Sequence, residues 1–305
     1  MWHPMPGAPE QGLPVLLEIV VPAFNEAERL PLGLSLLTRK AAVLPLTAAI
    51  LVVDNASTDE TADIVRDWPI GPVPVRLLRC EQRGKGAAVR TGLLATRAPY
   101  IGFCDADMAT DLAAMDLVIR LLATGHRAII GSRAHRRSVV EARHNWFRTA
   151  GAAIFRGLAR TVVEGATDTQ CGFKFFSGPL ARAAAARMRA AGFAFDVELI
   201  ARCVQLGASI TEIPVSWRDV PGSTFCARRH SAGALREIAS IWLTLNRRQE
   251  PTDGQIGPHH PLSGAGDEPI MAISAGRTRW QRFHSDDGPR SGDLGRAAAA
   301  IHSSP

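Results

Sequence analysis

Tyrosine is nearly missing from this sequence, and so are several patterns that mark common classes of protein. The 305 residues include one tyrosine, and aromatic residues make up 6% of the chain. No cysteines have zinc-finger spacing, and no apolar run reaches the roughly 20 residues that cross a bilayer. These absences leave no predicted membrane span. They also make nucleic acid the weaker choice of partner for a chain with a net charge of +6.

The cysteines show no CxxC pair, and their number, five, is odd. We therefore expect reduced thiols in a cytosolic protein rather than a disulfide framework. Residues 1–14 contain no basic region followed by an apolar run, so we expect a flexible N-terminus without a signal peptide. The positive charge, which is rich in arginine, favours anionic partners such as phosphates or an acidic membrane surface.

Strand-like and helix-like segments alternate along the first half of the chain. Continuous apolar runs predict strands at residues 15–24, 48–57, 75–80, 100–107 and 127–133. Helical spacing of apolar residues predicts helices at 26–44, 59–68, 84–96 and 111–125. This alternation predicts an α/β fold in which helices cover both faces of a mostly parallel sheet.

The second half of the chain is less regular. Its patterns predict a helix at 178–192, a strand at 210–217 and an amphipathic helix at 231–248. Proline, glycine, serine and histidine dominate residues 249–305 without periodicity, so we expect a disordered tail. One globular domain is therefore predicted over residues 15–248.

Polar residues gather where the predicted strands end, and ligands of such sheets bind at the carboxyl ends of the strands. These residues are Asn25, Glu26, Asp54, Asp105, Asp107 and Arg133. Asp105 and Asp107, in the sequence DAD, could face one cation, because hard ions such as Mg²⁺ and Mn²⁺ take oxygen ligands. A solvated loop or a cap of the following helix is the alternative interpretation of DAD.

The segment RGKGAAVRTG (83–92) brings backbone N–H groups and Lys85 to the start of a predicted helix. Such a helix start can bind an anion, although the glycines could also serve tight packing. The segment lacks the spacing of a P-loop, and no GxGxxG follows the first strand. A kinase-like NTPase and a dehydrogenase are therefore disfavoured.

Several motifs occur together in one order. They are VVPAFNEAERL (20–30), VVDNASTDETADI (52–64), RGKGAAVRTG, DAD, GSR (131–133), DTQCGFKFF (168–176), FAFDVELI (193–200) and VSWRDVPGS (215–223). Over about residues 17–245 the sequence resembles family 2 glycosyltransferases of the GT-A (Rossmann-like) fold. The resemblance is strongest to the dolichyl-phosphate glucosyltransferase group, with the polyprenyl-phosphate mannose synthases nearby.

The resemblance implies inverting, metal-dependent transfer of a hexose from a nucleotide sugar to a lipid phosphate. UDP-glucose is the first choice of donor, GDP-mannose the second, and Mg²⁺ or Mn²⁺ the cofactor. It also implies peripheral contact with an anionic membrane at its cytoplasmic face. A soluble small-molecule acceptor and a catalytically inactive nucleotide-binding protein remain alternatives.

The resemblance also assigns residues to roles. The implied donor-binding residues are Pro22, Asn25, Glu26, Asp54, Lys85 and Asp105, and the implied metal ligands are Asp105 and Asp107. The implied catalytic residues are Asp168, Gln170 and Arg133, and the implied acceptor-binding residues are Lys174, Asp196, Glu198, Arg228 and Arg229. Ala109 stands where mannose synthases often have a glutamine metal ligand, which favours the glucosyl branch or leaves a ligand to water.

The polar motif DTQCGFKFF leaves some roles open. Asp168 and Gln170 could orient donor hydroxyls, and Lys174 could attract an acceptor anion or pair with Asp168. The three phenylalanines are expected to pack the motif onto the sheet, and Cys171 is expected to be a small buried residue. Residues 136–163, rich in arginine and aromatic side chains, predict a helix that lies either on a membrane or on the sheet.

Overall fold

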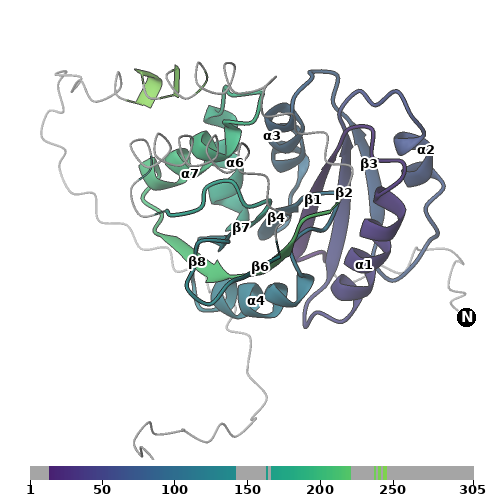
Figure 1. Cartoon of the computed structure of the whole chain (residues 1–305), viewed down its shortest axis with the longest axis horizontal. Coiled ribbons are helices and arrows are strands. Elements are labelled where there is room, and N and C mark those ends of the chain that lie inside the picture. The colour runs from purple at the N-terminus through teal and green to yellow at the C-terminus, as the bar shows by residue number, and fades with distance from the viewer. Residues whose placement is uncertain are drawn as a thin grey trace, which may run out of the picture. The chain divides into compact units, whose positions relative to one another are not determined.

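The computed structural model describes residues 14–141, 163, 166–220, 237, 240, 241 and 243–245 (Figure 1). Its strands are β1 (Leu17–Ala23), β2 (Ala48–Asp54), β3 (Val75–Arg79), β4 (Tyr100–Cys104), β5 (Ala128–Ser132), β6 (Val139–Glu141), β7 (Phe173–Ser177), β8 (Ile210–Pro214) and β9 (Ser216–Arg218). Its helices are α1 (Leu30–Ala42), α2 (Thr61–Arg66), α3 (Lys85–Ala95), the 3₁₀ helix η1 (Leu112–Ala114), α4 (Met115–Ala123), α6 (Gly178–Arg187) and α7 (Phe195–Gln205).

A seven-stranded sheet forms the centre of the described part, with the order β3-β2-β1-β4-β7-β5-β8. All neighbouring strands are parallel except β7, which runs antiparallel to both β4 and β5. The predicted α/β fold with a mostly parallel sheet is therefore confirmed. The sequence analysis did not predict β7, because Lys174 interrupts its apolar residues.

The central strands β1 and β2 are almost entirely apolar because both faces of the sheet are covered by helices (Figure 1). Every residue of β1 and of β2 is buried. Residues of α1 and α4 share one hydrophobic core, and residues of α3, α6 and α7 share the other. The sheet is thus held between two layers of helices, which leaves its edges as the places where polar groups reach solvent.

Two predicted strands end earlier than the patterns suggested. The predicted strand 100–107 ends at Cys104, so Asp105 and Asp107 lie in the loop that follows β4. The predicted strand 210–217 is divided in two, because β8 pairs with β5 whereas β9 pairs with β6 in a separate ribbon. The Val215 N–H between them donates to Ser138 Oγ at 3.0 Å.

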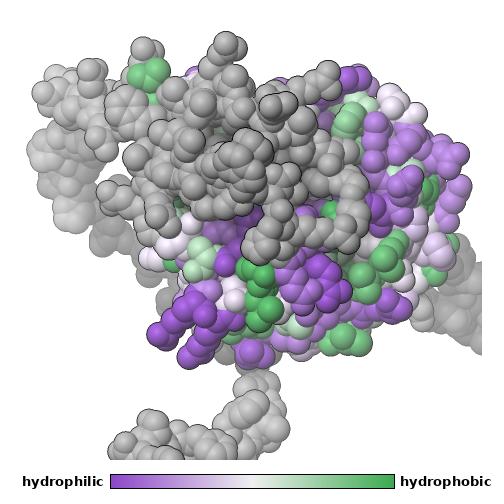
Figure 2. Space-filling model, in the orientation of Figure 1, coloured by the Kyte–Doolittle hydropathy of each residue, from purple (hydrophilic) through white to green (hydrophobic). Residues whose placement is uncertain are grey.

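Within the described part, no helix is long and apolar enough to cross a membrane. On the face drawn in Figure 2, hydrophobic residues lie in small groups among hydrophilic ones. Among the described residues, Cys80, Cys104, Cys171 and Cys203 are free and buried.

Several predictions fall outside the described residues: the N-terminal segment 1–13, the tail 249–305, Arg228, Arg229 and most of 136–163. For the helix predicted at 231–248, the described positions are helical. Ile241 and Leu245 are buried in the core beside α3, α6 and α7.

Candidate active site

The DAD carboxylates lie in the loop after β4, at the carboxyl edge of the sheet. The Asp105 N–H donates to Gly172 O at 3.0 Å, which ties this loop to the start of β7. Asp107 Oδ1 accepts from the Ala109 N–H at 3.1 Å. The side chains of Asp105 and Asp107 are 30% and 23% exposed. Both carboxylates can therefore be reached from solvent.

Lys85 is the closest cation to this pair of carboxylates. Its Nζ lies 2.6 Å from Asp105 Oδ1. Lys85 is the first residue of α3 and follows Gly84, whose φ is 127°. A Cβ atom on Gly84 would lie 2.1 Å from Ala191 O, so only glycine lets the start of α3 approach that backbone. The glycines of the segment 83–92 thus serve packing, and the packing positions Lys85 beside Asp105.

The two carboxylates differ in their ease of ionisation. Burial opposes ionisation of Asp105, but Lys85 and, more weakly, Lys174 and Arg133 hold its pKa below the ordinary value. Burial and the neighbouring charge of Asp105 raise the pKa of Asp107. Asp105 thus has several cations nearby. Asp107 has less positive charge around it than Asp105.

Glu26 and Arg29 form a second charged pair, which lies near Asp107. Arg29 Nη2 donates to Glu26 Oε1 at 2.6 Å, and Arg29 Nη1 lies 3.9 Å from Asp107 Oδ2. Burial raises the pKa of Glu26 to about 7, against the opposing effect of Arg29. Arg29 was not among the predicted site residues, although its position three residues after Glu26 in the motif NEAER could have indicated an ion pair.

The loop after β1 is joined to the loop after β2. Asn25 has a φ of 52°, its Oδ1 accepts from the Thr58 N–H at 2.8 Å, and its N–H donates to Ser57 Oγ at 3.0 Å. The Glu26 N–H donates to Thr61 Oγ1 at 2.8 Å. These hydrogen bonds engage Asn25 in joining the two loops. A role of Asn25 in donor binding would therefore be indirect.

Pro22 was also expected to surround the donor nucleotide. It is buried within β1, opposite Val53 of β2. This placement does not fit direct contact with a ligand, because the side chain is enclosed by the neighbouring elements.

Asp54, at the end of β2, borders a pocket of about 340 Å³. The pocket is lined by Asp54, Ala56, Ser57, Asp59, Ala62, Asp63, Arg66, Arg79, Cys80 and Glu81. The neighbouring Asn55, which sequence reasoning missed, accepts from the Gly84 N–H at 2.7 Å and donates to Gln82 O at 2.7 Å. Asn55 thereby connects this pocket to the start of α3 and to Lys85.

Asp168 is bound by Arg133 rather than by Lys174. Arg133 Nε and Nη2 donate to its two carboxylate oxygens at 2.7 and 2.8 Å, and the Arg133 backbone N–H donates at 2.9 Å. Burial opposes ionisation, but these contacts hold the pKa of Asp168 at about 2. A carboxylate with so low a pKa is a weak base at neutral pH.

Glu212 of β8 binds the backbone of the segment that carries Asp168. Glu212 Oε1 accepts from the backbone N–H groups of Thr167 and Asp168 at 2.6 and 3.0 Å. Gln170 Nε2 is buried and has no hydrogen-bond partner among the described residues. A buried amide without a partner is costly, so Gln170 is a candidate for contact with a bound ligand.

Lys174 and Asp196 are not where an acceptor could reach them. Lys174 is 0% exposed, and its Nζ donates to Asp196 Oδ1 at 2.5 Å and to Cys171 O at 2.6 Å. This pair joins β7 to α7 inside the protein. This arrangement favours a structural role for Lys174 and Asp196 over the predicted contact with the acceptor, which stays a prediction, and Lys174 pairs with Asp196 rather than with Asp168.

Glu198 is also buried, and its carboxylate is hydrogen-bonded within the protein. It is 1% exposed, accepts from Arg202 Nη2 at 2.9 Å and from the Ala190 N–H at 2.7 Å. These bonds occupy its oxygens within the helical layer of α6 and α7. Burial separates Glu198 from solvent and so favours a structural role, while its predicted contact with the acceptor stays a prediction.

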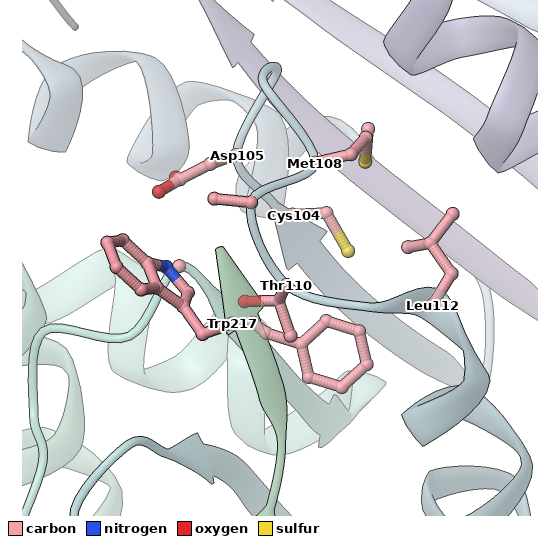
Figure 3. A pocket seen from close by; sticks show the side chains of 9 residues that line it. Cys104, Asp105, Met108, Thr110, Leu112 and Trp217 are labelled. Atoms are coloured by element: carbon pink, nitrogen blue, oxygen red, sulfur yellow. The ribbon is translucent and has the colours of Figure 1, made fainter. Parts of the chain in front are cut away.

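Trp217 connects the two parts of the site. The Arg133 guanidinium lies 5.6 Å from the centre of the Trp217 ring, within the range of a cation–π contact. Asp105, Gly172 and Trp217 also border a cavity of about 10 Å³. Figure 3 shows the Asp105 carboxylate and the Trp217 ring on the same side of the loop that carries Asp105, away from Leu112.

A divalent cation is implied by the resemblance, and the residues present fit one. No group of three or more His, Cys, Asp or Glu among the described residues could hold a metal by itself. Mg²⁺ is commonly bound by one or two carboxylates, with substrate phosphates and water as the remaining ligands. Asp105 and Asp107 supply two such carboxylates, so a site completed by the donor phosphates matches this pattern.

The fold is shared with solved glycosyltransferases. The crystal structure of glucosyl-3-phosphoglycerate synthase from Mycobacterium tuberculosis in complex with uridine-diphosphate aligns with a TM-score of 0.56 and 17% identity. The alignment covers 76% of this chain and 80% of that one. The seven-stranded sheet with its covering helices therefore has the GT-A-like α/β fold.

The sequence comparisons define its family. The model described as Glycosyl transferase family 2 matches residues 18–177, and this chain belongs to that family. It is 34% identical to the dolichyl-phosphate beta-glucosyltransferase of Drosophila melanogaster over 242 residues, which cover 74% of each protein. The Homo sapiens protein of the same description is 34% identical over 222 residues, or 68% of each.

Proposed function

We propose that this glycosyltransferase transfers glucose from UDP-glucose to a dolichyl- or polyprenyl-type lipid phosphate, with inversion and with Mg²⁺ or Mn²⁺ as cofactor. GDP-mannose is the second choice of donor. The relatives described as dolichyl-phosphate beta-glucosyltransferases support both the sugar and the acceptor class. A related fold crystallised with Mn²⁺, uridine-diphosphate-glucose and phosphoglyceric acid supports the donor and the metal, with a TM-score of 0.53.

The hydrogen bonds that Asp168 accepts from Arg133 are the observation that favours a phosphate acceptor. A sugar hydroxyl needs a base to take its proton, and Asp168, with three hydrogen bonds from Arg133 and a pKa of about 2, is a poor one. A phosphate monoester has a second pKa near 6, so it is mostly dianionic at neutral pH and attacks without a base. Such an acceptor needs cations to hold it, and Arg133 offers a partly exposed one.

Departure of the nucleoside diphosphate is the step that needs most help, because its oxygens gain negative charge as the glycosidic bond breaks. Lys85 lies against Asp105, and both Lys85 and Arg133 act on that carboxylate, so they supply positive charge near the departing diphosphate. A divalent cation, when bound by Asp105 and Asp107, would act as a Lewis acid toward the diphosphate.

We place the nucleoside of the donor in the pocket beside Asp54. A carboxylate at that point can accept hydrogen bonds from a base N–H or from ribose hydroxyls. The Asn55 bonds connect this pocket to Lys85, so a nucleoside in it would direct its phosphates toward Asp105. This arrangement follows the general position of ligands in open α/β sheets.

We also propose peripheral contact with an anionic membrane, with the cytoplasmic face as the predicted side. Arg136 and Arg137 are exposed, and Val139 and Val140 of the adjoining β6 are 57% and 43% exposed. Basic and apolar side chains side by side suit a lipid headgroup layer. The ribbon partner β9 carries Trp217, so this surface continues toward the site.

The decisive experiment combines purified protein, radiolabelled UDP-glucose and MnCl₂ with either dolichyl phosphate in detergent or phosphoglyceric acid in solution. We expect label to enter the organic phase with the lipid, and NMR to show a β-linked glucose from the α-linked donor. Removal of the metal with EDTA should abolish transfer, and added Mn²⁺ should restore it. Transfer to the soluble acceptor alone would refute the proposed lipid acceptor.

Flotation with vesicles tests the membrane contact separately. Wild-type protein should float with phosphatidylserine vesicles but not with phosphatidylcholine vesicles, and the Arg136→Glu/Arg137→Glu variant should float less. Equal flotation of wild type and variant would remove these arginines from the proposal.

A further inference from the structure

Most charges around Asp105 are already paired within the protein. Arg133 is paired with Asp168, Lys174 with Asp196, and Arg29 with Glu26. The fourth close pair is Lys85 with Asp105, at 2.6 Å. Within the part of the chain that the structure describes, these pairs leave Asp107 with one ion pair, at 3.9 Å to Arg29, whose charge Glu26 already shares.

Among the described residues, Asp107 is thus the carboxylate of this cluster with the most distant cationic partner. Lys174 and Arg133 act on Asp105 in addition to Lys85. A divalent cation would need the oxygens of Asp105, and there it would meet the Lys85 ammonium. The cation and Lys85 therefore compete for the same carboxylate.

The backbone of Lys85 is held by close packing, whereas its side-chain ammonium group can move. The Gly84 N–H donates to Asn55 Oδ1, and a Cβ atom on Gly86 would lie 2.5 Å from Ala190 O, so the start of α3 is closely packed. The Lys85 side chain is 26% exposed, and a lysine side chain has four rotatable methylene groups. A diphosphate placed beside Asp105 would offer the ammonium a second anionic partner.

We infer that Lys85 is an internal counter-ion of Asp105 that makes divalent-cation binding depend on the nucleoside diphosphate. Without the diphosphate, Lys85 holds Asp105 and keeps metal affinity low. With it, Lys85 shifts its charge to the phosphate oxygens and Asp105 becomes available to the metal. This inference rests on the proposed use of a metal and a UDP donor, and it predicts reciprocal coupling between the two ligands.

Calorimetric titration of MnCl₂ into the protein, with and without saturating UDP, measures this coupling. We expect UDP to tighten Mn²⁺ binding to the wild type, within the usual coupling range of roughly 5- to 150-fold. In Lys85→Met, Mn²⁺ alone should bind about tenfold tighter than to the wild type, so that the tightening by UDP falls by the same factor. Lys85→Gln should behave in the same way, and a thermal melt of each variant verifies folding.

Lys40→Met is the matched control. Lys40 Nζ lies 2.7 Å from Asp116 Oδ1, so this variant loses a similar ion pair that includes neither Asp105 nor Asp107. It should leave both Mn²⁺ titrations unchanged.

The outcomes separate the two proposals. If Mn²⁺ fails to bind the wild type even with UDP, the proposed metal-dependent function fails. If the wild type binds Mn²⁺ with UDP but folded Lys85→Met and Lys85→Gln bind Mn²⁺ alone no more tightly, only the role of Lys85 is overturned.

Discussion

The carboxylate of Asp105 lies directly against the backbone of Gly172. A Cβ atom on residue 172 would be 2.0 Å from Asp105 Oδ2, which is closer than two such atoms can approach. The glycine of the motif DTQCGFKFF is therefore what allows Asp105 to lie between β7 and Lys85. Because only the end of a side chain blocks the added methyl group, a larger residue would displace the carboxylate rather than the fold.

Gly172→Ala should consequently impair catalysis much more than stability. A displacement of about 1 Å at a reacting group can cost about 100-fold in rate, and we expect a fall of that order in kcat/KM. Thermal melting should shift by only a few degrees. Steady-state transfer assays and melting curves measure the two effects.

Gly71→Ala is the control for this prediction, because an added Cβ there meets no atom within 4 Å. It should leave both kcat/KM and the melting temperature nearly unchanged. A Gly172→Ala enzyme with wild-type kcat/KM would show that the position of Asp105 is not critical.

Asp168→Asn should lower stability in a way that depends on pH. The folded-state pKa of Asp168, about 2, is below the ordinary value of an aspartate, so the ionised carboxylate stabilises the fold. This contribution, about 2 kcal/mol, is fully present above the unfolded pKa and is lost as the pH falls through the folded pKa. The difference in unfolding free energy between wild type and variant should therefore shrink by roughly half between pH 7 and pH 3.

Denaturant titrations at several pH values measure that difference. Asp63→Asn is the comparison, since Asp63 forms an ion pair with Arg66 on the exposed surface and should contribute less than about 1 kcal/mol. A stability difference for Asp168→Asn that stays constant down to pH 3 would contradict the assigned pKa.

Lys174→Met should destabilise the protein strongly, because it leaves Asp196 buried without its partner. Loss of one member of a buried pair typically costs about 3–5 kcal/mol. The double variant Lys174→Met/Asp196→Leu should be more stable than Lys174→Met alone, since no isolated charge remains. Chemical unfolding of the wild type, single and double variants tests this.

The same experiment separates a structural role of Lys174 from the predicted contact with the acceptor. If Lys174→Met had wild-type stability but a raised KM for the acceptor, Lys174 would bind the acceptor after all and the buried pair would not be structural.

Trp217→Leu should reduce kcat/KM by roughly 2- to 30-fold, the range expected from loss of one cation–π contact to Arg133. Trp217→Phe keeps an aromatic face and should retain more activity than Trp217→Leu. Steady-state kinetics with the donor varied provide the measurement.

Trp68→Leu is the matched control, because Trp68 and Trp217 are both half-buried and pack on the same hydrophobic core, whereas the contact with Arg133 belongs to Trp217. Its effect should appear in stability and not in kcat/KM. Equal kinetic losses in Trp217→Phe and Trp217→Leu would argue against the contact with Arg133.

The elements from β1 to β5 were predictable because each shows its own signal within a few residues. The apolar runs that form β1 and β2 are buried on both sides, and the helices between them have regular apolar spacing. The position of DAD at the carboxyl edge follows from the same order of elements. Strand β7 was missed because Lys174 breaks its apolar run, and the partner that makes this lysine tolerable, Asp196, comes 22 residues later.

The sequence by itself determined the α/β class, the edge of the sheet at which the site forms and the residue types that gather there. Those features depend on local periodicity, which is readable along the chain. Only the tertiary structure decided which charge meets which: Arg133 with Asp168, Lys85 with Asp105 and Lys174 with Asp196. The physical reason is that an ion pair depends on separations of a few ångströms between residues far apart in sequence, and packing alone sets those separations.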